Sequence, residues 1–336
     1  IIDSFSKTKV RKMKPFIRNL LRMSVYQIKY MDAVPDSAVC NEAVKLAKRH
    51  KFAQLSGFVN GVLRNIARNI DSVQFDTLSI RYSMPQWIVD RFVSAYGEKK
   101  AEEIFKAFHS KSTISIRTNL TRCTPDELRA MLEAEGVTVT AVDELNYAFV
   151  ISGFDYLNGL QSFRDGLFYV QDISSMLVAQ TAAPKKGDYV IDVCAAPGGK
   201  STHIAELLQG SGHVLARDLT DNKVDMIEEN IDRHGLNNMS AEVWDATVFD
   251  ADSAGKADIL ICDLPCSGLG VLGRKKDIRY KMTPESVDEL AALQRQILDT
   301  VHTYVKPNGV LVYSTCTIDE AENEDNVRWF IEKHPE

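Results

Sequence analysis

Cysteine is scarce in this sequence, and no apolar run approaches the length of a membrane span. Six cysteines among 336 residues are too few for a disulfide framework, which favours an intracellular protein. Cys262 and Cys266 are four residues apart, but no second cysteine or histidine pair lies at zinc spacing, so we expect no metal site. No secretory leader opens the chain. We therefore expect a cytoplasmic protein without a membrane partner.

An excess of positive charge is lacking outside the first 70 residues. Residues 1–70 hold fourteen lysines and arginines against four acidic residues, which gives them a net charge of +10. Because the whole chain has a net charge of −6, the other 266 residues carry about −16. A basic lobe on an acidic body suggests a polyanionic partner, because lysine and arginine that neutralise phosphates release counterions. A solvated helical face explains the basic residues equally well.

The first 70 residues are expected to form a small helical bundle with a basic exterior. Apolar residues between Met13 and Leu21 recur at helical spacing, and a similar stripe runs from Leu55 to Ile70. Between them, Ser37 is expected to cap a helix that extends through Leu46. Residues 71–160 predict a small mixed α+β domain. Its expected helices lie near residues 85–96, 100–109 and 125–135, and its strands at 113–119 and 137–142.

Residues 161–336 predict a third, catalytic domain. From about Gly187, short β-branched runs alternate with helical patterns. This rhythm indicates a doubly wound, Rossmann-like α/β sheet, which binds ligands at the carboxyl ends of its strands. We expect strands at residues 189–193, 213–216, 240–243, 257–262 and 309–313, and helices at 200–208, 222–234 and 284–305.

A loop of small residues follows the first of these strands. Small residues and glycines let the backbone approach a ligand at the start of a helix. The loop contains neither the G-x-G-x-x-G fingerprint nor the G-x-x-x-x-G-K-[ST] motif, which argues against a dinucleotide-dependent dehydrogenase and a P-loop enzyme. A tight turn alone would also explain its two glycines. The loop reads Cys194-Ala195-Ala196-Pro197-Gly198-Gly199-Lys200.

Acidic residues follow the next three strands. Asp218, Asp245 and Asp263 are expected to line one crevice. A carboxylate in such a position commonly accepts hydrogen bonds from ribose hydroxyls, so three of them favour a nucleoside ligand. Helix capping is the alternative explanation for one or two of them.

The fourth and fifth strands each lead to a cysteine. Cys266 follows Asp263 closely, and Cys316 follows Tyr313. A single cysteine is more often inert packing than a nucleophile. Two cysteines that face one crevice beside Asp263 favour chemistry.

These residues resemble a known family, the RNA cytosine-carbon-5 methyltransferases. The resemblance rests on residues 194–200, 263–268 and 313–316, followed by Glu322-Asn323-Glu324. Upstream, Gln171-Asp172 and Ser174-Ser175 resemble the segment that leads into the catalytic domain. Further stretches resemble the NusB-type RNA-binding domain of the branch called RsmB, Sun or Fmu, which methylates small-subunit ribosomal RNA in bacteria. These stretches are Tyr26-Gln27, Val34-Pro35, Asn41-Glu42-Ala43-Val44 and Val59-Asn60-Gly61-Val62-Leu63-Arg64.

The resemblance covers nearly the whole chain and implies the roles of the site residues. Cys316 would be the nucleophile that adds to carbon 6 of a cytosine, Cys266 would assist release of the product, and Asp263 would contact the cytosine edge. S-adenosylmethionine would be the cofactor. It would be held by residues 194–200 together with Asp218, Lys223, Asp245 and Asp263.

The resemblance also implies contacts with ribosomal RNA. The basic stretch past Cys266 is expected to hold phosphates, and Tyr280 could stack on a base. An exposed basic loop without such a role is the alternative. The candidate RNA-contact residues are Arg274, Lys275, Lys276, Arg279, Tyr280, Arg11, Lys12 and Arg64.

Two departures and two alternatives accompany the resemblance. Leu264 stands where many relatives have alanine, and the family's last strands do not follow Glu336. Because the chain also begins with Ile1, we expect a piece clipped at both ends, and we expect a monomer. One alternative is a DNA-type cytosine methyltransferase, in which Cys266 would attack. The other is a non-catalytic RNA-binding factor in ribosome assembly.

Overall fold

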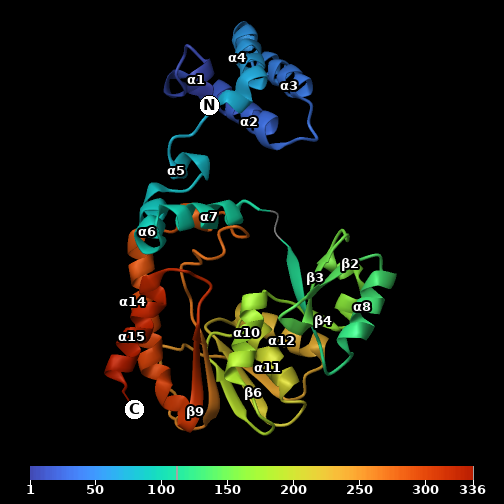
Figure 1. The fold of residues 1–336 in the computed structure, drawn as a ribbon, viewed down its shortest axis with the longest axis vertical. Coiled ribbons are helices and arrows are strands. Elements are labelled where there is room, and N and C mark those ends of the chain that lie inside the picture. Colours follow the sequence, from blue (N-terminus) through green and yellow to red (C-terminus); the bar gives the residue numbers. More distant parts are fainter. Residues whose placement is uncertain (111–112, 336) are drawn as a thin grey trace. The chain divides into compact units, whose positions relative to one another are not determined.

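The computed structural model describes residues 1–110 and 113–335, and it divides the chain between Ser83 and Met84 into two compact units (Figure 1). Each unit is described by itself. The predicted domain boundaries at residues 70 and 160 stay predictions. No helix in the described parts of the chain is long and apolar enough to cross a membrane.

The first unit is helical, as the apolar stripes predict. Its core joins residues of α2, α3 and α4, among them Leu21, Ala47 and Leu63, which are fully buried. The helices are α1 (Ile2–Phe5), α2 (Pro15–Tyr30), α3 (Asp36–Arg49), α4 (Ser56–Asn69) and α5 (Leu78–Arg81), with 3-10 turns at Val10–Lys12, Ala53–Leu55 and Ile70–Ser72.

The predicted cap of α3 is wrong. The helix begins at Asp36 and runs to Arg49, beyond the predicted end at Leu46, and no side chain caps it. Pro35 occupies the cap position with a φ of −61°. Proline already holds the backbone angle that a helix start requires, so the chain can turn into the helix one residue before Ser37.

The second unit contains the doubly wound sheet, which confirms the predicted fold class. Five parallel strands lie in the order β7-β6-β5-β8-β9. The strands are β5 (Tyr189–Asp192), β6 (His213–Asp218), β7 (Met239–Val243), β8 (Ala257–Asp263) and β9 (Val305–Ser314).

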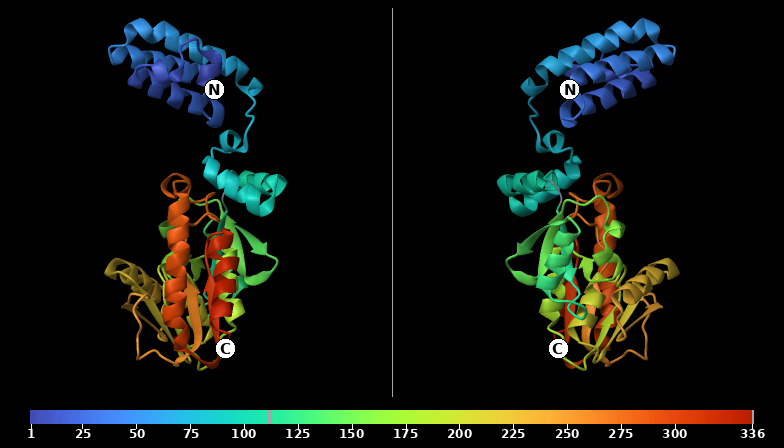
Figure 2. Two further views of the ribbon diagram at one scale, coloured as in Figure 1. Left: turned by 90° about the vertical axis from the view of Figure 1, so that its left-hand side faces the viewer. Right: turned by 90° about the vertical axis from the view of Figure 1, so that its right-hand side faces the viewer.

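Helices cover both faces of this sheet. One face packs against α10, α11 and α12 through residues such as Ile204 and Ile227. The other face packs against α14 and α15 through residues such as Leu298 and Trp329, and the two helices lie side by side in Figure 2. The helices are α10 (Ile173–Ala182), α11 (Gly199–Leu207), α12 (Asp221–His234), α14 (Pro284–Val301) and α15 (Glu324–Lys333).

A smaller antiparallel sheet precedes the large one, in the order β2-β3-β1-β4. One face packs on α8, and the other packs on Met176 of α10. The sequence analysis missed β3 and β4. The elements are β1 (Ile114–Thr118), β2 (Thr138–Val142), β3 (Leu145–Ser152), β4 (Phe168–Val170) and α8 (Pro125–Ala134).

Shorter elements complete the second unit. Two helices, α6 (Gln86–Tyr96) and α7 (Glu98–Phe108), confirm the two helices expected near residues 85–96 and 100–109. The remaining elements are α9 (Gln161–Arg164), α13 (Ile278–Lys281) and 3-10 turns at Leu157–Gly159, His302–Tyr304 and Glu320–Glu322.

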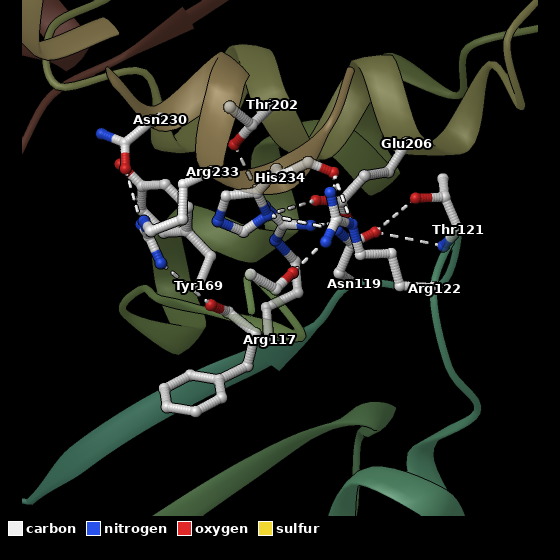
Figure 3. A network of polar contacts seen from close by, with 12 residues as sticks. Arg117, Asn119, Thr121, Arg122, Tyr169, Thr202, Glu206, Asn230, Arg233 and His234 are labelled. Atoms are coloured by element: carbon white, nitrogen blue, oxygen red, sulfur yellow. Dashed lines mark hydrogen bonds and ion pairs between the residues drawn. The ribbon is translucent and has the colours of Figure 1, made fainter. Parts of the chain in front are cut away.

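A buried polar network joins the small sheet to α11 (Figure 3). The guanidinium of Arg117 on β1 forms an ion pair with Glu206, and it donates to Thr202 Oγ1 (3.2 Å) and Gln171 Oε1 (2.8 Å). Arg117 and Glu206 are almost completely buried. Because a buried charge without its partner is costly, this pair fixes how the small sheet sits on the helix that follows the glycine loop.

A neutral histidine lies beside this network. His203 of α11 is 2% exposed, and its ring meets that of Tyr147 edge-on at 5.3 Å. Neither ring nitrogen has a hydrogen-bond partner among the described residues. Burial, together with the positive charge of Arg117, holds the pKa of His203 well below its ordinary value.

We predict that acid destabilises the second unit partly through His203. The unfolded chain takes up a proton on this histidine below pH about 6.5, whereas the folded protein does not, so the free energy of unfolding falls as pH drops. The slope from this residue is at most about 1.4 kcal/mol per pH unit. Urea unfolding followed by tryptophan fluorescence measures it, and His203→Phe keeps the ring but should flatten the slope. Equal slopes in both proteins would contradict the prediction.

Candidate active site

The parallel register of β8 and β9 brings two cysteines together. Asp263 pairs with Ser314 where the strands end, and the following loops carry Cys266 and Cys316. Their sulfur atoms are 3.2 Å apart, and the backbone N–H of Cys316 donates to Cys266 Sγ at 3.3 Å. Both are free thiols, and Cys316 is exposed.

The pKa values of the two thiols are shifted in opposite directions. The hydrogen bond with Cys266 is the main cause that lowers the pKa of Cys316 to about 7, against burial and the charge of Asp263, with help from Lys275 and Lys200. The same hydrogen bond, followed by burial, raises the pKa of Cys266. Cys316 is therefore the more acidic of the two thiols.

Asp263 lies beside the sulfur pair in a fixed orientation. Lys200 Nζ is 2.6 Å from Asp263 Oδ2, and Ser314 Oγ donates to Asp263 Oδ1 at 2.8 Å. Lys200 comes from the first turn of α11 and Ser314 from the end of β9. This places a carboxylate and an ammonium group next to the two thiols.

The loop at residues 194–200 is held from both sides. Gly198 adopts a φ of +99°, a conformation that favours glycine. The carbonyl of Pro197 accepts hydrogen bonds from Tyr169 Oη (3.2 Å) and Asn230 Nδ2 (2.9 Å). Figure 3 labels the side chains of Tyr169 and Asn230. A Cβ atom at Gly199 would lie 3.2 Å from the Tyr169 ring. The small sheet therefore supports the back of this loop.

A buried carboxylate lies beneath the start of the loop. Asp192, the last residue of β5, is 1% exposed, accepts a hydrogen bond from Ser201 Oγ and is 3.4 Å from the amide of Cys194. Burial is the main cause that raises its pKa to about 7. Sequence reasoning overlooked this residue because it lies one strand position before the loop, at the end of an apolar run.

The predicted ribose-binding carboxylates differ in their surroundings. Asp218 is buried and accepts hydrogen bonds from the amide of Ala196 (2.9 Å) and from Lys223 Nζ (2.8 Å). Asp245 is exposed and accepts from the amide and hydroxyl of Thr247, which lower its pKa. Asp218 therefore braces the glycine loop, while Asp245 has a free oxygen toward solvent.

A cavity of about 390 Å³ collects most of these groups. That volume suits a nucleoside-sized ligand. The sequence analysis missed its apolar walls, which include Trp244 after β7 and Leu293 and Ile297 on α14. No group of three possible metal ligands occurs among the described residues. The predicted residues that line the cavity are Cys194, Ala196, Asp218, Lys223, Asp245, Asp263, Cys266 and Cys316, whereas Ala195, Pro197, Gly198, Gly199 and Lys200 lie behind or beside it.

A G-x-G-x-x-G pattern does occur in the chain, at residues 268–273, but it follows β8 rather than β5. A Cβ atom at Gly270 would lie 2.7 Å from the carbonyl oxygen of Cys316, and one at Gly268 would lie 2.9 Å from Ile278. The glycines here permit a close approach to the Cys316 loop, and they are no dinucleotide fingerprint.

The candidate RNA-contact residues do not share one environment. Lys275, Lys276 and Tyr280 are exposed, and the partly exposed Arg274 pairs with Asp172. In the first unit, Arg11 and Lys12 are exposed, and Arg64 donates to Asn60 Oδ1. Arg279 differs from its expected role, because it is 4% exposed and donates to the carbonyl of Leu272. Its guanidinium holds the loop from within and is not available at the surface for a phosphate.

Comparisons with known proteins agree across three parts of the chain. The model of a family described as 16S rRNA methyltransferase RsmB/F matches residues 179–336. A NusB family model matches residues 1–68, and the ferredoxin-like domain of RsmF/B-like methyltransferases matches residues 84–154.

Individual relatives match nearly the whole chain. The probable ribosomal RNA small subunit methyltransferase B of Bacillus subtilis is 39% identical over 98% of this chain and 75% of its own length. The corresponding protein of Synechocystis is 33% identical over 99% of this chain and 77% of its own length.

Solved structures share the fold. NSun6 from Pyrococcus horikoshii with SFG, an analogue of S-adenosylmethionine, has a TM-score of 0.68 and 26% identity, over 74% of this chain and 87% of that one. A methyltransferase homologue from the same organism has a TM-score of 0.67 and 27% identity, over 76% of this chain and 80% of that one. The chain therefore belongs to the RsmB/F family of 16S rRNA methyltransferases and is an S-adenosylmethionine-dependent enzyme.

Proposed function

We propose that this enzyme methylates carbon 5 of a cytosine in small-subunit ribosomal RNA, with Cys316 as the covalent nucleophile. The observation that carries the proposal is the pair of free thiols at 3.2 Å, beside Asp263 and at the edge of the cofactor-sized cavity. Methylation of a carbon atom in an aromatic ring needs a nucleophile to activate the ring, and this pair supplies one.

The chemistry begins with addition of the Cys316 thiolate to carbon 6 of the cytosine. The new C–S bond breaks the aromatic system and makes carbon 5 nucleophilic. When bound, S-adenosylmethionine supplies the methyl group that carbon 5 takes. A base then removes the proton from carbon 5, and the electron pair of that C–H bond re-forms the double bond as the C–S bond breaks. Cys316 leaves as a thiolate.

The residues around the nucleophile have matching roles. Asp263, oriented by Ser314 and Lys200, is placed to hydrogen-bond the edge of the base. Cys266, whose pKa is raised by its hydrogen bond to Cys316, would assist release of the adduct. The opposite acidities favour this assignment over the DNA-type alternative, in which Cys266 would attack.

The cofactor and the RNA would approach different parts of the site. Cys194 and Ala196 of the loop, with Asp218, Lys223 and Asp245, would hold the cofactor against Trp244. The target base must leave its stack to reach Cys316. Lys275, Lys276 and Tyr280 are exposed on the loop past Cys266 and suit backbone contact and stacking. The basic first unit would add phosphate contacts, and a monomeric state stays a prediction.

We predict opposite behaviour for the two cysteine variants. Incubated with ribosomal RNA and S-adenosylmethionine, Cys266→Ala should accumulate a protein–RNA adduct that survives a denaturing gel, because release is impaired. Cys316→Ala should form none and should lose methyl transfer. Cys123→Ala, which changes a partly buried thiol outside the cavity, is the matched control. The reverse pattern would assign the attack to Cys266, and the absence of adduct and methyl transfer in every variant would favour a binding role alone.

The rate should also follow the ionisation of Cys316. With a pKa of about 7, the thiolate fraction grows roughly tenfold per pH unit below that value and levels off above it. Single-turnover methyl transfer between pH 5.5 and 9 measures this without interference from product release. A rate that is flat from pH 5.5 to 7 would contradict a titrating nucleophile.

RNA affinity should depend on the basic residues of the first unit. The triple change Arg11→Ala, Lys12→Ala and Arg64→Ala should weaken binding and flatten its salt dependence by about 0.7 to 0.9 in logarithmic slope per lost phosphate contact. Filter binding at several salt concentrations measures both. Arg328→Ala, whose guanidinium is paired with Asp325 at 2.8 Å, serves as the control. An unchanged slope in the triple variant would mean that the basic face is only solvated.

A further inference from the structure

A buried carboxylate lies directly behind the two cysteine loops. Glu322 is completely buried, six residues after Cys316 in the 3-10 turn Glu320–Glu322. It accepts hydrogen bonds from the amide of Ser267 (2.8 Å), from the Ser267 hydroxyl and from Gln294 Nε2 (3.0 Å). A buried carboxylate is tolerated only when such donors replace water, so the loss of any of these hydrogen bonds would destabilise the turn.

The donors connect Glu322 to both cysteine loops. Ser267 is the residue after Cys266, and its hydroxyl also lies 3.0 Å from Thr317 Oγ1. Thr317 is the residue after Cys316, and it is 7% exposed. A chain of three hydrogen-bonded side chains therefore runs from Glu322 through Ser267 to Thr317 and holds the neighbours of the two thiols at a fixed separation.

The surrounding groups make this carboxylate rigid. Gln294 of α14 also donates to the carbonyl of Pro265 at 2.8 Å, and Tyr313 donates from its hydroxyl to the carbonyl of Glu322. Arg91 of α6 pairs with Asp319 near the same turn. Each contact restrains the position of the turn, so movement of Glu322 would require several hydrogen bonds to break together.

We infer that Glu322 is a positioning residue that sets the distance between the Cys266 and Cys316 sulfur atoms, and through that distance the reactivity of Cys316. Glu322 is not among the described residues that line the cavity of the two cysteines. It acts through Ser267 and Thr317. Only the consequence for catalysis rests on the proposed function. The geometry of the thiol pair is present in the protein without RNA or cofactor.

The sulfur–sulfur contact is sensitive to small displacements. A hydrogen bond to sulfur weakens steeply as its donor moves away, and the Cys266 thiol is the main group that acidifies Cys316. The other groups that face Cys316 are Asp263, Lys275 and Lys200, whereas Arg91 and Tyr313 face Glu322. None of these five groups belongs to the hydrogen-bonded chain Glu322–Ser267–Thr317. A substitution of Glu322 should therefore change the distance between the two sulfur atoms more than the charges that face Cys316.

The test is the pH dependence of Cys316 alkylation by iodoacetamide in the full chain without RNA, with peptide mass spectrometry to separate Cys316 from Cys266. The unmodified protein should show a midpoint near 7. In Glu322→Gln, which replaces one accepting oxygen with a donor, the midpoint should rise toward the ordinary thiol value of about 8.5. Alkylation at pH 7 should slow about fivefold or more. Glu324→Gln, an exposed neighbour with the same charge change, should leave the midpoint unchanged.

A second variant keeps the test decisive if Glu322→Gln does not fold. Ser267→Ala removes only the hydroxyl that joins Glu322 to Thr317 and leaves the backbone contact in place. Its midpoint should move in the same direction. Folded Glu322→Gln and Ser267→Ala proteins that both keep the midpoint of the unmodified protein would overturn the inference and leave Glu322 a purely structural residue.

Catalytic consequences are measured separately. In single turnovers with RNA, Glu322→Gln should slow both the formation and the release of the adduct, because both thiols lose their relative placement. If the unmodified protein forms no adduct and transfers no methyl group, the proposed function fails, while the alkylation profile still decides the positioning role. A normal adduct lifetime in a variant with a shifted midpoint would overturn the part of the inference that concerns release.

Discussion

The site depends on the register of two neighbouring parallel strands. From Ile259 and Val310 onward, β8 and β9 pair residue by residue up to Asp263 and Ser314, and the amide of Leu264 extends the ladder by one more bond to Ser314. Both chains therefore leave the sheet at the same level, and Cys266 and Cys316 meet within the next three residues. A slip of one residue would turn every side chain of the slipped strand to the opposite face and separate the thiols. The proposed covalent chemistry thus rests on ordinary backbone pairing.

Local sequence was sufficient to predict this edge of the sheet. Short β-branched runs alternate with helices, which defines the strands, and parallel strands place their carboxyl ends together. Asp218, Asp263 and the two cysteines follow those ends directly, so their meeting in one cavity could be anticipated. Each of these residues is placed by the strand immediately before it in the chain.

Residues placed by distant parts of the chain could not be predicted in this way. Leu293 lines the cavity only because α14 packs beside it, and Arg279 is buried by the loop that it stabilises. The low pKa of Cys316 comes chiefly from Cys266, fifty residues earlier in the chain, with smaller contributions from Lys275 and Lys200. The strand β3, with buried residues on both faces, lacks the strict alternation that marks a half-exposed strand.

Three buried carboxylates hold the walls of the site. Asp192 lies beneath the glycine loop, Glu206 ties Arg117 of the small sheet to α11, and Glu322 joins the two cysteine loops. Burial of a charged carboxylate costs free energy, whereas burial of a hydrophobic side chain in the same place would not. Their hydrogen-bond donors come from elements far apart in the sequence. Each carboxylate therefore fixes the relative position of two elements more firmly than packing alone would. In the proposed reaction, a base that enters this site would meet thiols already in place, so less of its binding energy would be spent on ordering the loops.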